Sequence, residues 1–148
     1  MAAHKILYPT DFSAMSLTAL EAATSLARER GATLVIVHVE EPPLDYAGVD
    51  FDYRPEAARD EILGKLKRLV PTDVSVLVEH RLIAGVPAPT IVEMAQRENV
   101  DLIVMATHGR TGLRRVLMGS VAEEVVRTAK CPVLTVKPAA ATVAPAPA

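Results

Sequence analysis

The chain has 148 residues with a formal charge of −2, and half of them are hydrophobic, which fits one domain with a sizeable core. The near-balanced charge argues against nucleic acid as the main partner, because no domain-wide basic field would release counterions. The single cysteine, Cys131, excludes an internal disulfide and fits a reducing compartment. No apolar run approaches a membrane span, and the N-terminus does not resemble a signal peptide. We therefore expect a cytoplasmic protein with no membrane partner.

The first third of the chain predicts a strand, a helix and a second strand. Residues 5–8 form a short β-type run that ends at Pro9, which cannot donate to a ladder. Residues 10–13 offer several N-cap candidates for a helix that would stop at Gly31, a natural C-terminal residue. Residues 33–39 are apolar at nearly every position, which predicts a strand covered on both faces.

The rest of the chain continues the alternation of helices and strands. Residues 40–54 are rich in Pro and Asp, which is more typical of a solvated loop than of a metal site. The tail 139–148 contains only Ala, Pro, Thr and Val, and we expect it to be disordered after a domain at 1–138. The alternation predicts an α/β fold with a mainly parallel sheet between two layers of helices. The remaining predicted elements are helices at 55–69, after 84–89 and at 120–128, and strands at 74–82, 102–105 and 133–136.

The connection from residue 107 to residue 119 is the most distinctive stretch. A strand-to-helix connection usually takes about 2–6 residues, and this longer one holds three glycines, three arginines and no acidic residue. It ends at Gly119-Ser120, where we expect a helix to begin with Ser120 as the N-cap. Exposed amides, a helix N-terminus and cationic side chains together predict a phosphate-binding loop.

The established phosphate motifs are absent. Neither G-x-x-x-x-G-K-[ST] nor G-x-G-x-x-G occurs, so no P-loop or Rossmann motif is present. Gly109 to Gly112 match the G-x-x-G of a KH loop, but the charge balance argues against RNA. His108 has no Ser or Cys partner at a useful spacing, and the histidines and the cysteine show no zinc spacing. We therefore predict no catalytic residue and no protein metal site.

Three segments together resemble the universal stress protein family over residues 3–138. They are the opening strand and turn at 6–13, Gly85-x-Pro87, and residues 101–112 with Gly119-Ser120. The ATP-binding branch of that family carries G-x-x-G, nine residues, then G-[ST]. Gly109, the spacer 110–118 and Gly119-Ser120 match this pattern, whereas Ala106 replaces the first glycine. A positive φ there would cost about 1 kcal/mol or more, but the strand context predicts ordinary β angles and little cost.

The resemblance implies a five-stranded sheet of order 3-2-1-4-5, with ligand binding where the order reverses. It implies ATP or AMP, with or without Mg²⁺, in that crevice. Gly109, Gly119 and Ser120 would hold the phosphates, and Asp11 would contact the ribose unless it only caps the first helix. Pro9, Val39 and Met105 would line the adenine pocket, and we add Arg110 as a phosphate partner. Thr10, Ala106, His108 and Val121 complete the predicted nucleotide-binding set.

We predict a stress-response regulatory protein that binds an adenine nucleotide and acts as a homodimer on an unidentified protein partner. The strand at Val133–Val136 would lie at the sheet edge, where an apolar strand invites a second copy. A slow ATPase or an autophosphorylating protein is one alternative, although no general base or Walker-type acid is evident. A dimeric interaction protein that binds no nucleotide is another, which Ala106 leaves open.

Overall fold

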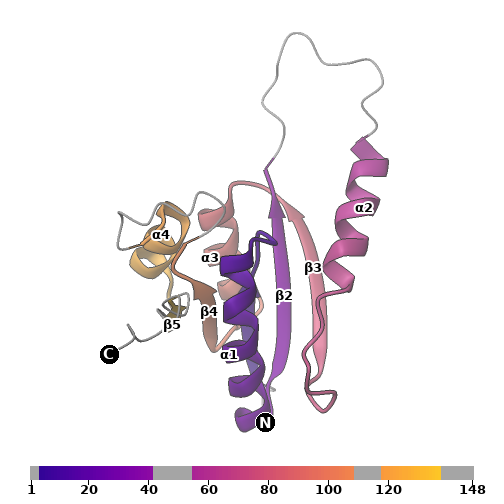
Figure 1. Cartoon of the computed structure of the whole chain (residues 1–148). Helices are drawn as coiled ribbons and strands as arrows, with labels where there is room; N and C mark the ends of the chain where they lie inside the picture. The colour runs from indigo at the N-terminus through magenta and orange to yellow at the C-terminus, as the bar shows by residue number, and fades with distance from the viewer. Residues whose placement is uncertain (1–3, 42–54, 109–117, 138–148) are drawn as a thin grey trace, which may run out of the picture.

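The computed structural model describes residues 4–41, 55–108 and 118–137. Strands and helices alternate through these residues, as predicted (Figure 1). No helix in the described ranges is long and apolar enough to cross a membrane. The elements are β1 (Lys5–Pro9), α1 (Ala14–Arg30), β2 (Thr33–Glu40), α2 (Pro55–Lys67), β3 (Val78–Ala84), α3 (Pro87–Arg97), β4 (Leu102–Ala106), α4 (Ser120–Thr128) and β5 (Val133–Val136).

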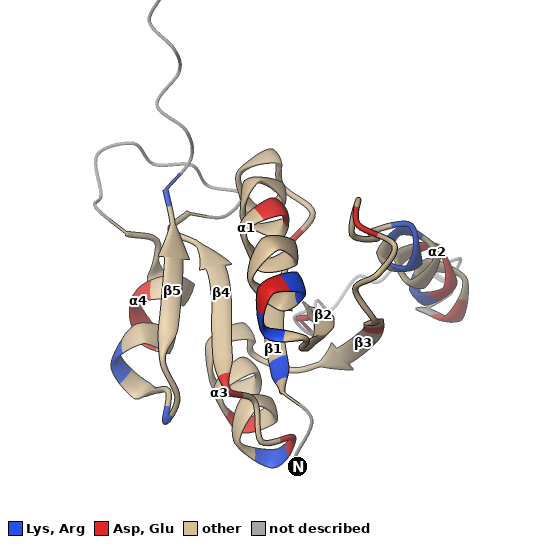
Figure 2. Cartoon of the chain, turned by 90° about the horizontal axis from the view of Figure 1, so that it is seen from below, with Lys and Arg blue, Asp and Glu red and all other residues tan. Residues whose placement is uncertain are grey.

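The five strands form one parallel sheet of order β3-β2-β1-β4-β5, which confirms the predicted topology. The order reverses between β1 and β4, and their carboxyl ends therefore flank the crevice in which open α/β sheets bind ligands. β5 lies at one edge of the sheet and pairs only with β4. In Figure 2 the strands carry few charged residues, whereas the helices carry many.

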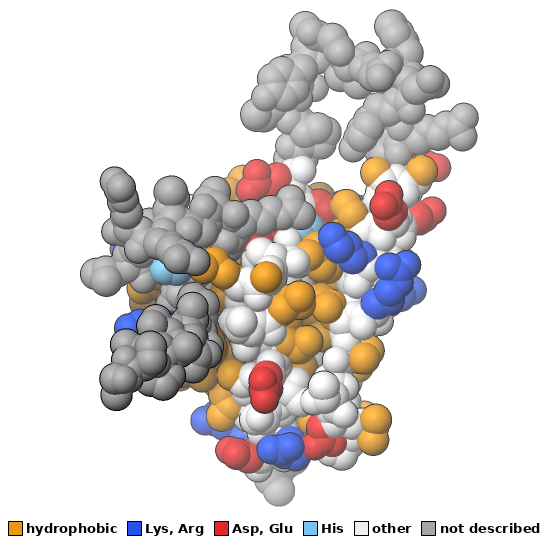
Figure 3. Space-filling model, viewed as in Figure 1, with side chains coloured by type: hydrophobic (Ala, Val, Ile, Leu, Met, Phe, Trp, Pro, Cys, Tyr) orange, Lys and Arg blue, Asp and Glu red, His pale blue; other side chains and the backbone are white. Residues whose placement is uncertain are grey.

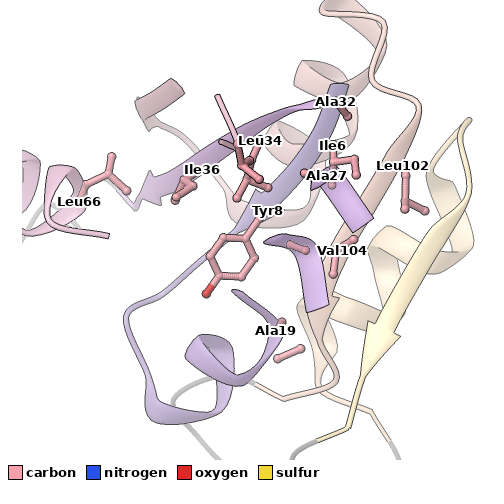
Figure 4. Packing of buried hydrophobic residues seen from close by; sticks show 13 residues of the cluster. Ile6, Tyr8, Ala19, Ala27, Ala32, Leu34, Ile36, Leu66, Leu102 and Val104 are labelled. Atoms are coloured by element: carbon pink, nitrogen blue, oxygen red, sulfur yellow. The ribbon is translucent and has the colours of Figure 1, made fainter. Parts of the chain in front are cut away.

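The core has two layers, one on each face of the sheet. Alternate residues of β1 point to opposite faces, so Ile6 and Tyr8 pack in one layer and Leu7 packs in the other. The first layer contains side chains from α1 together with Leu66 of α2 (Figure 4). The second contains side chains from α3 and α4. Burial on both faces explains why the central strands are apolar at almost every position.

Helix α1 begins and ends at the expected residues. Ser13 is its N-cap, and the Ser13 hydroxyl accepts a hydrogen bond from the Ser16 amide at 3.1 Å. Gly31 ends it in the left-handed conformation with φ +62°, and its amide bonds the last turn of the helix. Ser13 belongs to the turn that follows β1, so this cap fixes the end of the turn at which α1 begins.

The third strand differs from its predicted range. β3 begins at Val78 rather than at residue 74, and α2 ends at Lys67 rather than at residue 69. Val74 and Leu77 are 98% and 73% exposed, so these apolar residues belong to the connection and not to the sheet. Their hydrophobicity alone made the segment resemble a strand.

Ala106 is the last residue of β4 and pairs with Val136 of β5. Among the described residues other than glycine, only Phe12 and Asn99 have a positive φ. The prediction of ordinary strand angles at Ala106 is therefore confirmed, and its methyl group is buried in the layer under α1.

Candidate functional site

A cleft of about 920 Å³ opens at the carboxyl ends of the strands. Its walls come from the turn after β1, the end of β2, helix α2, the start of α3, the end of β4 and the first turn of α4. This volume lies within the range of small-molecule sites, about 300–1,000 Å³. Gly109 and Arg110 of the predicted set lie outside the described residues. The other members all line the cleft: Pro9, Thr10, Asp11, Val39, Met105, Ala106, His108, Gly119, Ser120 and Val121.

The turn after β1 is held by a compact set of hydrogen bonds. Asp11 Oδ1 accepts from the Ser13 amide at 2.9 Å, while the hydroxyl of Ser13 caps the helix. The Thr10 hydroxyl is buried, lies 2.8 Å from the Ser16 hydroxyl and accepts from the Phe12 amide at 3.0 Å. Ser13 rather than Asp11 is thus the N-cap, and the Asp11 carboxylate lies beside the cap at the cleft wall.

Tyr8 lies beneath this turn. It is fully buried, and its hydroxyl donates to the Ser16 carbonyl at 2.6 Å. Burial raises the pKa of the phenol above its ordinary value, although hydrogen bonds with Thr10 and Ser16 partly oppose the shift. The phenol is therefore a neutral structural support for the turn.

The N-cap of helix α4 lies one residue earlier than predicted. Gly119 has extended backbone angles, φ −68° and ψ 160°, and is the N-cap, so the prediction that Ser120 caps the helix is wrong. Ser120 is the first helical residue and is exposed at the cleft. The Gly119 amide donates to the Thr107 carbonyl at 2.6 Å, which ties the start of α4 to the end of β4.

The Gly119 amide is already hydrogen-bonded to Thr107, so the donors available to an anion are the amides in the first turn of α4. The opening N–H groups of a helix have no acceptor within it, and here Ser120, Val121 and Ala122 all line the cleft. Together with the helix dipole, these amides favour a negatively charged group. His108 lies across the same opening, with its Nδ1 2.9 Å from the Thr107 hydroxyl.

The edge of β2 is open where β1 stops. The last β1–β2 pair is Pro9 with Val37, and the Thr10 amide donates to the Val37 carbonyl at 2.9 Å. Backbone groups of alternate residues point to the same side of a strand, so the N–H and C=O of Val39 also point toward the β1 side. β1 does not extend that far, and Val39 lines the cleft together with Pro9 and Met105.

His38 and Phe12 belong to the cleft but were not predicted. His38 Nδ1 lies 2.7 Å from the Thr10 carbonyl oxygen, and its ring centroid is 4.5 Å from that of Phe12. The Lys65 ammonium lies 4.8 Å from the centre of the Phe12 ring. The signal in the sequence was one polar residue near the end of an otherwise apolar strand. Figure 3 shows apolar side chains between α1 and α2, with cationic side chains on α2 beside them.

The acidic residues near the cleft do not form a metal cage. Glu40 pairs with Arg59 at 3.5 Å, and the described ranges contain no group of three or more His, Cys, Asp or Glu side chains that could hold a metal ion. A Mg²⁺ ion at this site would take most of its ligands from substrate phosphates and water, which is its usual habit.

The family model described as the universal stress protein family matches residues 2–137. The universal stress protein MJ0531 of Methanocaldococcus jannaschii is 39% identical over 140 residues, which cover 90% of this chain and 81% of that protein. The solved structure of hypothetical protein MJ0577 aligns with a TM-score of 0.75 and 30% identity, covering 93% of this chain and 98% of that one. A universal stress protein crystallised in complex with cAMP aligns at 0.67 and 28% identity, covering 93% and 98%.

Proposed function

Because the chain belongs to the universal stress protein family, we propose that it is a stress-response regulatory protein that binds ATP or AMP in the cleft. One observation carries the proposal: a single cleft is lined by the open edge of β2 at Val39 and by the first turn of α4. The first feature suits a base and the second suits phosphate. The cAMP complex of a structurally similar universal stress protein supports an adenine nucleotide as the ligand.

The base pocket favours adenine over guanine. The pairing edge of adenine offers the N1 acceptor beside the N6 amino donor, which complements the N–H and C=O of Val39. Guanine offers a donor at N1 beside an acceptor at O6. In the same position, its N1–H would face the Val39 N–H and its O6 would face the Val39 carbonyl oxygen, so neither hydrogen bond could form. A site that hydrogen-bonds one pattern rejects the other because buried polar groups are left unpaired. Pro9 and Met105 supply apolar surface for the ring, and Met105 is only 6% exposed.

The phosphates would lie at the start of α4. The Ser120 hydroxyl and the amides of Ser120, Val121 and Ala122 are the donors that we assign to them, with Gly119 leaving space for the approach. Gly109 and Arg110 remain proposed phosphate contacts from the motif, outside the described residues. Asp11 would hold the ribose, because a carboxylate accepts about four hydrogen bonds and can serve a ribose hydroxyl beside the Ser13 amide.

The protein would act as a homodimer that pairs through β5. This strand lies at the sheet edge, and Leu134 is 40% exposed. An exposed apolar edge strand is a template for pairing with another chain. A nucleotide bound between β1 and β4 would then change which partner protein the dimer recruits.

Calorimetric titration with ATP, AMP and GTP, with phosphate release followed in the same samples, tests the proposed function. We expect heat from both adenine nucleotides, little from GTP and no sustained release of phosphate. Multiple turnovers would instead identify a slow ATPase. No heat from any nucleotide would leave a dimeric interaction protein that does not bind nucleotide.

A further inference from the structure

We infer that His38 is a positioning residue that keeps the Val39 edge open to the base and thereby sets selectivity for adenine. This inference rests on the proposed function, because it concerns how the cleft reads a nucleotide base. His38 itself belongs to neither the base pocket nor the phosphate site assigned above. Its effect on the ligand would pass through the backbone of Thr10 and Val39.

The parallel ladder shows what His38 changes. Since the Thr10 amide donates to the Val37 carbonyl, the ladder pattern would next have the Val39 amide donate to the Thr10 carbonyl. The His38 ring donates to that carbonyl, with Nδ1 2.7 Å from the oxygen. No hydrogen bond joins Val39 to Thr10 in the part of the chain that the structure describes. The ladder thus ends one step early, at the carbonyl that the imidazole contacts, and we assign this end to His38.

The tautomer follows from the partner. A carbonyl oxygen only accepts, so Nδ1 of His38 must carry the hydrogen, and it carries one in the neutral ring and in the imidazolium alike. The ring is also held from the side, because its centroid lies 4.5 Å from that of Phe12. Phe12 in turn has φ +65° and donates its amide to the Thr10 hydroxyl, so the turn and the ring fix one another.

Without the imidazole donor, we expect the Val39 amide to bond to the Thr10 carbonyl, so that it is no longer open to a ligand. With the Val39 amide bonded to Thr10, only the Val39 carbonyl would remain for the ligand. That carbonyl accepts equally well from the N6 amino group of adenine and from the N1–H of guanine. The protein would still bind nucleotides through α4, but it would distinguish the two bases less well.

A matched pair of variants tests this role. His38→Asn keeps a side-chain N–H near the position of Nδ1, whereas His38→Leu has a similar shape and no donor. In the ligand-free protein, we expect the Val39 amide to exchange with solvent faster in the wild type and the Asn variant than in the Leu variant. The ratio of ATP to GTP affinity should fall about tenfold in the Leu variant, the effect of about one hydrogen bond, and should be largely kept in the Asn variant.

Two results would overturn the inference. One is equal Val39 exchange in the wild type and the Leu variant, which would mean that His38 does not control this amide. The other is an equal loss of ATP and GTP affinity in the Leu variant, which would indicate a merely structural role. The exchange comparison needs no nucleotide, so it decides the role of His38 in the backbone even if the wild type binds none.

Discussion

At the scale of single residues, the site depends on which backbone groups are already hydrogen-bonded within the protein and which are available to a ligand. Gly119 donates its amide to Thr107, and the donors left for a ligand are those of the next three residues. At the other end of the cleft, the Thr10 carbonyl serves the His38 ring. Side-chain identity thus acts here mainly by deciding which main-chain groups remain open.

Substitution of Gly119 tests the phosphate end of the cleft. The backbone of Gly119, with φ −68°, suits any residue, so Gly119→Val should leave the fold intact. Its branched side chain at the mouth of the helix should lower ATP affinity by at least about tenfold, roughly 1.4 kcal/mol. Gly119→Ala is the control and should lose less. Unchanged affinity in the Val variant, measured by calorimetry, would mean that the phosphates lie elsewhere.

The buried Tyr8 predicts a loss of stability at alkaline pH. Burial raises the pKa of its phenol in the folded state above the unfolded value of 10.0. The folded protein therefore holds this proton more tightly, and the resulting stability is present below pH 10 and lost as the pH rises through the folded pKa. Denaturant unfolding from neutral pH to strongly alkaline pH should show the wild type losing stability faster than Tyr8→Phe. Parallel curves for the two proteins would contradict this assignment.

At the scale of elements, the sequence was most informative where burial was strongest. The strands at the centre of the sheet are apolar on both faces, and this pattern predicted their positions correctly. Their order, which the family resemblance implied, is also confirmed. The start of β3 was not predicted correctly, because Val74 and Leu77 are apolar but exposed and the sheet edge buries less. Hydrophobicity predicts a buried strand only where the fold supplies a covering layer.

The site was predictable to a similar degree. The motif spacing pointed to the wall at the start of α4, and the family resemblance pointed to the wall at the ends of β1 and β2. Ser13, one of the cap candidates at 10–13, and Gly31 are the caps of α1. The hydrogen bonds of Gly119 with Thr107 and of His38 with Thr10 were not predictable, because each joins segments far apart in the chain. No local pattern encodes such a contact. These contacts form only when the turn after β1 packs against β2 and the start of α4 packs against the end of β4.

The turn between β3 and α3 gives a paired stability prediction. Gly85 has φ +156°, and a Cβ there would lie 2.4 Å from the Thr90 hydroxyl oxygen. Gly85→Ala should therefore destabilise the protein by about 1–3 kcal/mol. Gly64→Ala in α2 is the control: its Cβ would meet nothing closer than Arg68 at 3.8 Å, and it should stabilise by about 0.5–1 kcal/mol. Equal effects of the two changes on chemical unfolding would refute the account of this turn.

At the scale of the whole molecule, the cleft and the β5 edge of the sheet are separate features. The cleft lies where the carboxyl ends of the strands meet the first turn of α4. β5 follows α4 in the chain and pairs with β4. A ligand at the start of α4 is therefore separated from the proposed dimer edge by one helix only. In the proposed function, nucleotide binding could thus affect dimerisation through α4.

Proline substitution on β5 tests the dimer. The Pro132 carbonyl accepts from the Ile103 amide of β4, and the Val136 carbonyl accepts from the Thr107 amide just after β4. The backbone groups of Val133 and Thr135 therefore point outward. Thr135→Pro removes an outward N–H without breaking the β4 pairing, and it should raise the dimer dissociation constant at least about tenfold. Thr135→Val keeps the N–H and should leave the dimer unchanged in light scattering. A wild-type protein that is monomeric at micromolar concentration would contradict the dimer outright.

In the proposed complex, an adenine nucleotide bridges the β2 edge and the first turn of α4. The most direct measurement is a titration with ATP followed by amide chemical shifts in a ¹⁵N-labelled protein. We expect saturable shifts at Val39 and at Ser120, Val121 and Ala122 together, with GTP moving the Val39 amide much less. No shift with ATP, or shifts confined to residues away from the cleft, would contradict it.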